Sequence, residues 1–138
     1  MRRYDLPFLL LAATTLLVGV CMGIWMGLTH DFTLAPAHAH LNLLGWTSLA
    51  LFGLTYRVYP VLSASRLASV HFATAATGAV CFPVGIALSV TGVTMHVAVV
   101  GALLWLAAVI LFLAGLIRLA RAGSTATDFA PGARFARP

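Results

Sequence analysis

Long apolar runs separated by short polar stretches organise the whole chain. There are four such runs: Leu6–Leu28, His38–Tyr59, Leu67–Val90 and Met95–Leu119. Each is close to the roughly 20 residues with which an α-helix crosses about 30 Å of hydrocarbon at about 1.5 Å per residue. The pattern therefore predicts four transmembrane helices.

The connections between these runs are short, which makes consecutive helices antiparallel neighbours. We therefore expect an all-α integral membrane protein, an up-down bundle of four helices forming one domain over residues 1–120. The remaining segment, residues 121–138, is polar and contains glycine and proline, so we expect a disordered tail.

Composition agrees with a membrane protein, because 62% of the residues are hydrophobic and only 8% are charged. The net charge of +5 could suggest nucleic acid as a partner. The basic residues, all arginine, form no dense patch and stand instead at the ends of the runs, so we exclude that partner. Cys21 and Cys81 form no CxxC pair and indicate neither a disulfide scaffold nor a zinc site.

Arginine placement predicts the membrane topology. The arginines precede the first run, bracket the second connection and follow the fourth run: Arg2, Arg3, Arg57, Arg66, Arg118, Arg121, Arg134 and Arg137. Because arginine is retained on the cytoplasmic side, both termini are expected in the cytoplasm. The chain is thus expected to be a multi-pass protein of a bacterial-type inner (plasma) membrane, with the lipid bilayer as its first partner.

Two histidines, His38 and His40, stand where the second run begins. Ionisable side chains at such a position are expensive and indicate a functional site. By the predicted topology His30 and His96 share their outer depth, whereas His71 lies near the inner end. The separation exceeds about 20 Å along the helices, so we expect His71 to take no part in a mononuclear site with the others.

The two histidines of the second run cannot easily serve one metal, because two residues advance about 200° around an α-helix and leave them about 160° apart. An unwound first turn would remove that restriction. His38 shares its face with Asn42, which can orient a ligand, and Gly45, which leaves room for the edge of a planar macrocycle. A haem iron takes axial imidazoles, and His96, from the same or a neighbouring chain, is the expected second ligand.

A copper site is the alternative, with three or four imidazoles as metal ligands: His38, His40 and His96, with or without His30. Interfacial histidines can also simply face lipid headgroups. The small-residue stripe of Gly19, Gly23 and Gly27 allows a close approach of another helix or of a flat ligand, and ordinary helix packing is the favoured explanation.

The second run resembles a known family. Ala37-His38-Ala39-His40, Leu43-Leu44-Gly45-Trp46, Phe52-Gly53, Tyr56 and Tyr59-Pro60 together are similar to the second transmembrane helix of haem–copper oxidase subunit I and nitric-oxide reductases, and to the NnrS family. The resemblance implies an axial haem ligand, on His38 if the Ala-His-Ala register is matched and on His40 if His-x-Asn is matched. We favour His38, and include Trp46 of the motif among the cofactor-binding residues.

A second stretch, Val70-His71-Phe72, Gly78, Phe82-Pro83 and Gly92, resembles the penultimate helix of the same subunit. The chain would then correspond to the first two and last two helices, one arc of the larger protein, which a homotrimer could imitate. The helices that hold the copper ligands of the oxidase are absent. A binuclear oxygen-reducing centre is therefore not expected.

Three functions remain open. The first is a small b-type haem protein in electron transfer or in binding or sensing of O2 or NO, with its haem near the outer face. The others are a copper-binding or oxidase-assembly factor, and a structural accessory subunit of a respiratory complex. The membrane runs hold no paired carboxylates, so independent enzymatic activity stays uncertain. Partners would be a second or third copy of the chain and a respiratory complex or electron carrier.

Overall fold

The computed structural model describes residues 3–128, with side chains described as far as residue 122. Its helices are α1 (Asp5–Thr29), α2 (Ala35–His40), the π-helix η1 (Leu41–Ser48), α3 (Leu49–Val58), the 3₁₀ turn η2 (Pro60–Ala64), α4 (Arg66–Val90) and α5 (His96–Asp128). Because α2, η1 and α3 follow one another without a break, they form one continuous helical segment. The protein is therefore all-α with four long helical segments.

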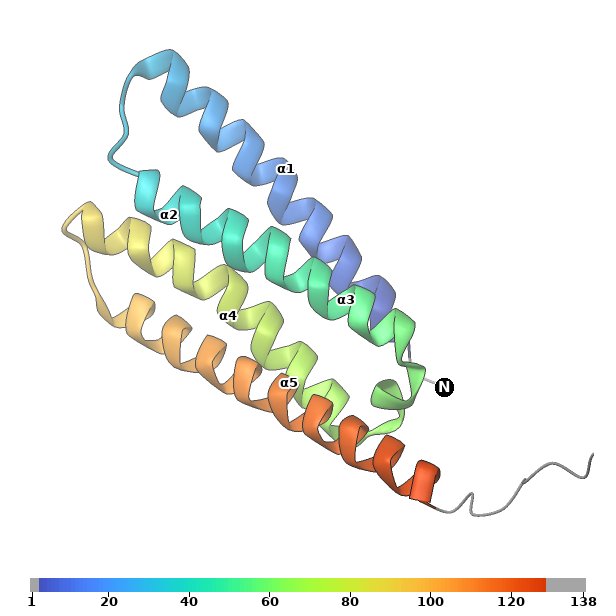
Figure 1. Ribbon diagram of the computed structural model, residues 1–138. Coiled ribbons are helices and arrows are strands. Elements are labelled where there is room, and N and C mark those ends of the chain that lie inside the picture. The colour runs from blue at the N-terminus through green and yellow to red at the C-terminus, as the bar shows by residue number, and fades with distance from the viewer. Residues whose placement is uncertain (1–2, 129–138) are drawn as a thin grey trace, which may run out of the picture.

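The four segments lie in sequence order, each antiparallel to the one before it (Figure 1). Helix α1 packs on η1 and α3, α2 and η1 pack on α4, and α4 packs on α5 along most of its length. In Figure 1 the segments form a row with α1 and α5 at its two edges, and aromatic side chains add contacts of α1 with α4 and of α3 with α5.

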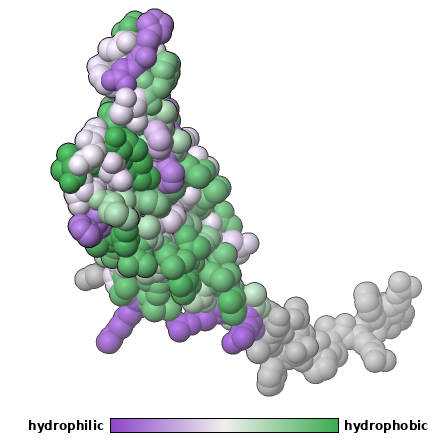
Figure 2. Space-filling model, turned by 90° about the vertical axis from the view of Figure 1, so that its left-hand side faces the viewer, coloured by the Kyte–Doolittle hydropathy of each residue, from purple (hydrophilic) through white to green (hydrophobic). Residues whose placement is uncertain are grey.

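Three helices, α1, α4 and α5, are long and apolar enough to cross a membrane. The face seen in Figure 2 is mostly apolar, with strongly polar side chains at its top and bottom and a few polar groups between them. Helix α5 differs from the sequence prediction because it continues to Asp128. Alanines at positions 120, 122 and 126 favour that extension into the segment expected to be a disordered tail; residues 129–138 lie outside the described part.

Small residues set the packing of α1 on the second segment. Gly23 lies under the imidazole of His38, and Gly19 lies under the amide of Asn42. Further along the same face the glycine is on the second segment and the side chain is on α1: a Cβ on Gly45 would be 2.8 Å from Cβ of Thr15. The predicted helix packing of the glycine stripe is thus confirmed for Gly19 and Gly23, whereas Gly27 has no neighbour within 4 Å.

Helices α4 and α5 pack more closely on each other than α1 packs on the second segment. A Cβ on Gly85 would meet the backbone of Ala98, one on Gly101 would meet the backbone of Phe82, and one on Gly78 would lie 2.9 Å from the backbone nitrogen of Trp105. These pairs follow one another in antiparallel register, so the two helices touch backbone to backbone over several turns.

The largest fully buried side chains lie further along the helices, away from His38 and His40. Phe8 and Leu49 are fully buried, and Phe52 contacts Phe8 from α1 and Phe112 from α5. This aromatic core joins the α1 side of the row to the α5 side, because α3 carries Phe52 between them. It surrounds His71 of α4, which is 1% exposed.

Candidate functional site

His40 is the last residue of α2, and its imidazole makes one hydrogen bond to the backbone of its own helix. Nδ1 lies 2.8 Å from the carbonyl oxygen of Pro36. Since a carbonyl only accepts, Nδ1 must carry the proton and donate it, which leaves Nε2 of the neutral ring with a free lone pair. Metal-bound histidines are typically oriented by such a second-nitrogen hydrogen bond. The ring is half-buried and packs edge-on to Phe82 of α4, with centroids 5.1 Å apart.

The backbone changes its winding immediately after His40. From Leu41 to Ser48 the segment is π-helical, and Ser48 Oγ donates to the carbonyl of Leu43, five residues earlier, at 2.9 Å. π-Helical turns are rare, and they occur often at functional sites. The wider winding sets the rotation between His40 and the aromatic residues of α3.

His38 faces the opposite neighbour, as the helical spacing predicts. Its imidazole lies over Gly23 of α1, with Cε1 3.1 Å and Nε2 3.7 Å from the position of a Cβ there. Asn42 donates to the carbonyl of His38 at 2.9 Å, and its amide nitrogen lies 3.3 and 3.4 Å from the two ring nitrogens. The ring of His38 therefore lies against the α1 backbone and is half-buried there.

The space expected beside Gly45 is filled by Thr15, so it does not accept the edge of a macrocycle in this arrangement. Trp46 is 36% exposed and belongs to the outward surface of the second segment. Neither Gly45 nor Trp46 lines the groove of about 350 Å³ that lies between α1, α4 and the second segment. The difference arises from tertiary packing, because α1 covers the face of the second segment on which a ligand was expected.

His96 is exposed at the first residue of α5, and His30 is exposed at the end of α1. The level of His40 along the row is set by Phe82, whose backbone meets Gly101 of α5. From Gly101 to His96 the helix rises about 7.5 Å further toward the outer end. His96 therefore lies about one and a half helical turns beyond Gly101, the residue of α5 that meets the backbone of Phe82.

No group of three or more histidine, cysteine, aspartate or glutamate side chains that could hold a metal ion occurs among the described residues. His38, His40 and His96 thus do not converge within one chain. Of the pair at the start of the second segment, His40 is the histidine whose ring is held by a hydrogen bond to a backbone carbonyl.

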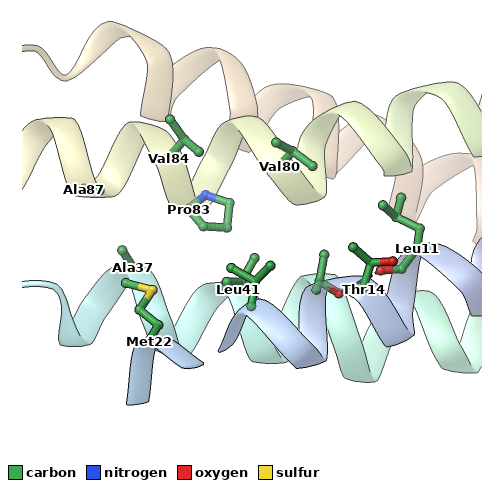
Figure 3. A pocket seen from close by; sticks show the side chains of 11 residues that line it. Leu11, Thr14, Met22, Ala37, Leu41, Val80, Pro83, Val84 and Ala87 are labelled. Atoms are coloured by element: carbon green, nitrogen blue, oxygen red, sulfur yellow. Dashed lines mark hydrogen bonds between the residues drawn. The ribbon is translucent and has the colours of Figure 1, made fainter. Parts of the chain in front are cut away.

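An apolar groove of about 350 Å³ lies next to the histidine pair, bounded by α1, α4 and the second segment (Figure 3). Ala37 and Leu41, which flank His38 and His40 in the chain, line it together with Met22, Pro83 and Val84. The volume is at the lower end of the range for small-molecule sites. The groove could receive an apolar part of a ligand held at this end.

Sequence reasoning missed a buried polar pair, Tyr56 and His71, at the end of the helices opposite His40. Tyr56 Oη and Nδ1 of His71 are 3.1 Å apart, and Nε2 of His71 is buried without a hydrogen-bond partner among the described residues. Phe8, Phe52 and Phe112 surround the ring, with centroids 4.8 to 5.6 Å away. The spacing of Tyr56 and His71 across a turn carries no signal of this contact, so only the folded structure reveals it.

Comparison of the chain with protein-family models, curated proteins and solved structures gave no match.

Proposed function

We propose that the chain is a subunit of a homo-oligomeric b-type haem protein of a bacterial-type inner membrane, acting in electron transfer or in O2 or NO binding. Its haem lies near the outer face, and His40 is the axial ligand contributed by each chain. The resemblance to the second helix of haem–copper oxidase subunit I supports the cofactor. The choice of His40 rather than His38 rests on the geometry of the two rings.

The hydrogen bond from Nδ1 of His40 to Pro36 carries this proposal. It fixes the tautomer and leaves Nε2 as the nitrogen available to iron. His38 lacks this property, because its ring nitrogens both face Asn42 and the α1 backbone. The π-helix begins at Leu41, directly after His40. Because π-helical turns occur often at functional sites, it also supports a functional site at this end of the molecule.

Two states of the second axial position are consistent with the fold: a histidine of a second copy, or an open position. His96 of a second copy can supply that histidine, because His96 is exposed on α5, the edge helix of the row. Six-coordinate iron would then serve electron transfer. An open sixth position would instead bind a gas. A dimer or trimer is the partner that the first arrangement requires.

Copper binding is the second candidate, as a metal-carrying or assembly factor. The candidate copper site has three or four imidazole ligands, and the described residues of one chain do not bring three such ligands together. A site of that kind would therefore need histidines from more than one chain, which makes the oligomer a common feature of both candidates. A structural accessory role, through the open edges of the row, is the remaining alternative.

Purification of the full chain from cells supplied with haem precursor tests the proposal. We expect a Soret band, sharp α and β bands on dithionite reduction, and stable haem binding in detergent. A colourless protein that binds copper in a fixed ratio would support the second candidate. A colourless and metal-free protein would contradict both.

A further inference from the structure

The end of the helices opposite His38 and His40 is strongly cationic. The described side chains there include one acid, Asp5, and the arginines Arg3, Arg57, Arg66, Arg118 and Arg121. Asp5 is already neutralised by Arg3, at 2.8 Å, and contacts Arg57 at 3.5 Å. Polar side chains project from the lower end of the molecule (Figure 2). An anionic partner is therefore favoured at this end.

A pocket of about 140 Å³ opens on this cationic end, between the η2 turn and α5. Val61 and Leu62 form one wall, and Gly115 and Leu119 form the other. The missing side chain of Gly115 keeps the walls apart, since a Cβ there would already lie 3.8 Å from Leu62. The pocket is therefore an apolar slot at the level where the helices leave the hydrocarbon.

The rim of this slot carries the charge. Arg118 and Ser65 line it, and neither ion pair among the described residues involves Arg118. Ser65 caps α4 by accepting from the backbone N–H of Leu67 at 3.2 Å, so the positive end of a 25-residue helix also lies at the rim. An apolar slot with a cationic rim matches an amphiphile with a negative headgroup.

We propose that this slot binds an anionic phospholipid, with its phosphate at Arg118 and its glycerol and upper acyl chain against Val61 and Leu62. The occupant is a lipid rather than free phosphate, because the walls are apolar and stand at the membrane boundary. The site is independent of the haem proposal. It lies at the other end of the row and would persist in a metal-free protein.

Native mass spectrometry of the full chain, titrated with phosphatidylglycerol or phosphatidylcholine of identical acyl chains, tests the site. We expect tighter binding of phosphatidylglycerol, and about a five-fold loss in Arg118→Gln, the effect of one arginine near a membrane surface. Gly115→Leu fills the slot without changing charge, and the same preference should fall there too. Arg57→Gln, which removes equal charge outside the slot, should retain it.

Three results would overturn the proposal. Equal binding of the two lipids excludes a headgroup site. An equal loss in Arg57→Gln and Arg118→Gln indicates diffuse attraction of the whole end. Full retention in Gly115→Leu, with that variant folded by circular dichroism, excludes the slot as the place of binding.

Discussion

At the scale of single residues, hydrogen bonding distinguishes histidines that the sequence shows as equals. His40 has one nitrogen bound and one free, His38 has its ring held against α1, and His71 has one nitrogen bound to Tyr56 and one buried without a partner. The sequence predicted that His38 and His40 face apart, and this is confirmed by their contacts with Gly23 and Phe82. It could not predict which ring is oriented for a ligand, because Pro36 and α1 decide that.

The contact between Tyr56 and His71 gives a prediction about stability. Tyr56→Phe removes the partner of Nδ1 and leaves both nitrogens of a buried imidazole unpaired, which we expect to cost about 1–3 kcal/mol of unfolding free energy. The double variant Tyr56→Phe His71→Phe should recover most of the loss, because replacing both partners with apolar groups is nearly neutral. Denaturant unfolding in detergent measures both changes.

Tyr59→Phe is the matched control, since Tyr59 is 46% exposed and should tolerate the loss of its hydroxyl. A Tyr56→Phe protein as stable as the unmodified chain would show that the buried pair contributes nothing. It would also mean that Nδ1 of His71 finds another partner.

At the scale of elements, the glycines separate tight from loose contacts. Gly101→Leu would drive a side chain into the backbone of Phe82, and we expect destabilisation of about 3 kcal/mol from overpacking of the α4–α5 hairpin. Gly27→Leu is the control, because nothing lies within 4 Å of its added Cβ. Thermal unfolding followed by circular dichroism compares the two, and equal melting temperatures would contradict the packing described here.

The four apolar runs were recognisable because length and hydropathy alone define a membrane-spanning helix, and three of them are long and apolar enough in the structure. The π-helical winding from Leu41 to Ser48 was not predicted. Apolar spacing distinguishes a helix from a strand, but neighbouring helices select between α and π windings. The same limit explains why Gly45, expected beside a ligand, instead receives Thr15.

At the scale of the whole molecule, the row leaves α1 and α5 as edges, which is why we expect a second or third copy. The charge asymmetry predicts the orientation: arginines gather at the end that holds the N-terminus, the η2 turn and the end of α5. An alkaline phosphatase fusion after residue 138 should be inactive, and one placed in the loop near Asp31 should be active, because the enzyme folds only outside the cytoplasm. The reverse pattern would contradict the proposed topology.

The number of chains in the oligomer could not be predicted from the sequence of one chain. His96 contributes to a site only if a neighbour presents it, and no spacing within the sequence encodes that contact. We expect the purified chain to elute from a size-exclusion column as a dimer or trimer, with its mass measured by light scattering in detergent. A strictly monomeric haem protein would require an open sixth position on the iron, and so favour gas binding over electron transfer.

The most direct measurement is the reduced-minus-oxidised absorption spectrum of the purified full chain beside His40→Ala and His38→Ala. We predict that His40→Ala loses the haem bands and that His38→Ala retains them, because the Nδ1 hydrogen bond of His40 leaves its Nε2 free and oriented, whereas the ring of His38 lies against α1. Loss of the bands in His38→Ala with retention in His40→Ala would contradict the assignment of the ligand. Absence of haem from all three proteins would contradict the proposed function itself.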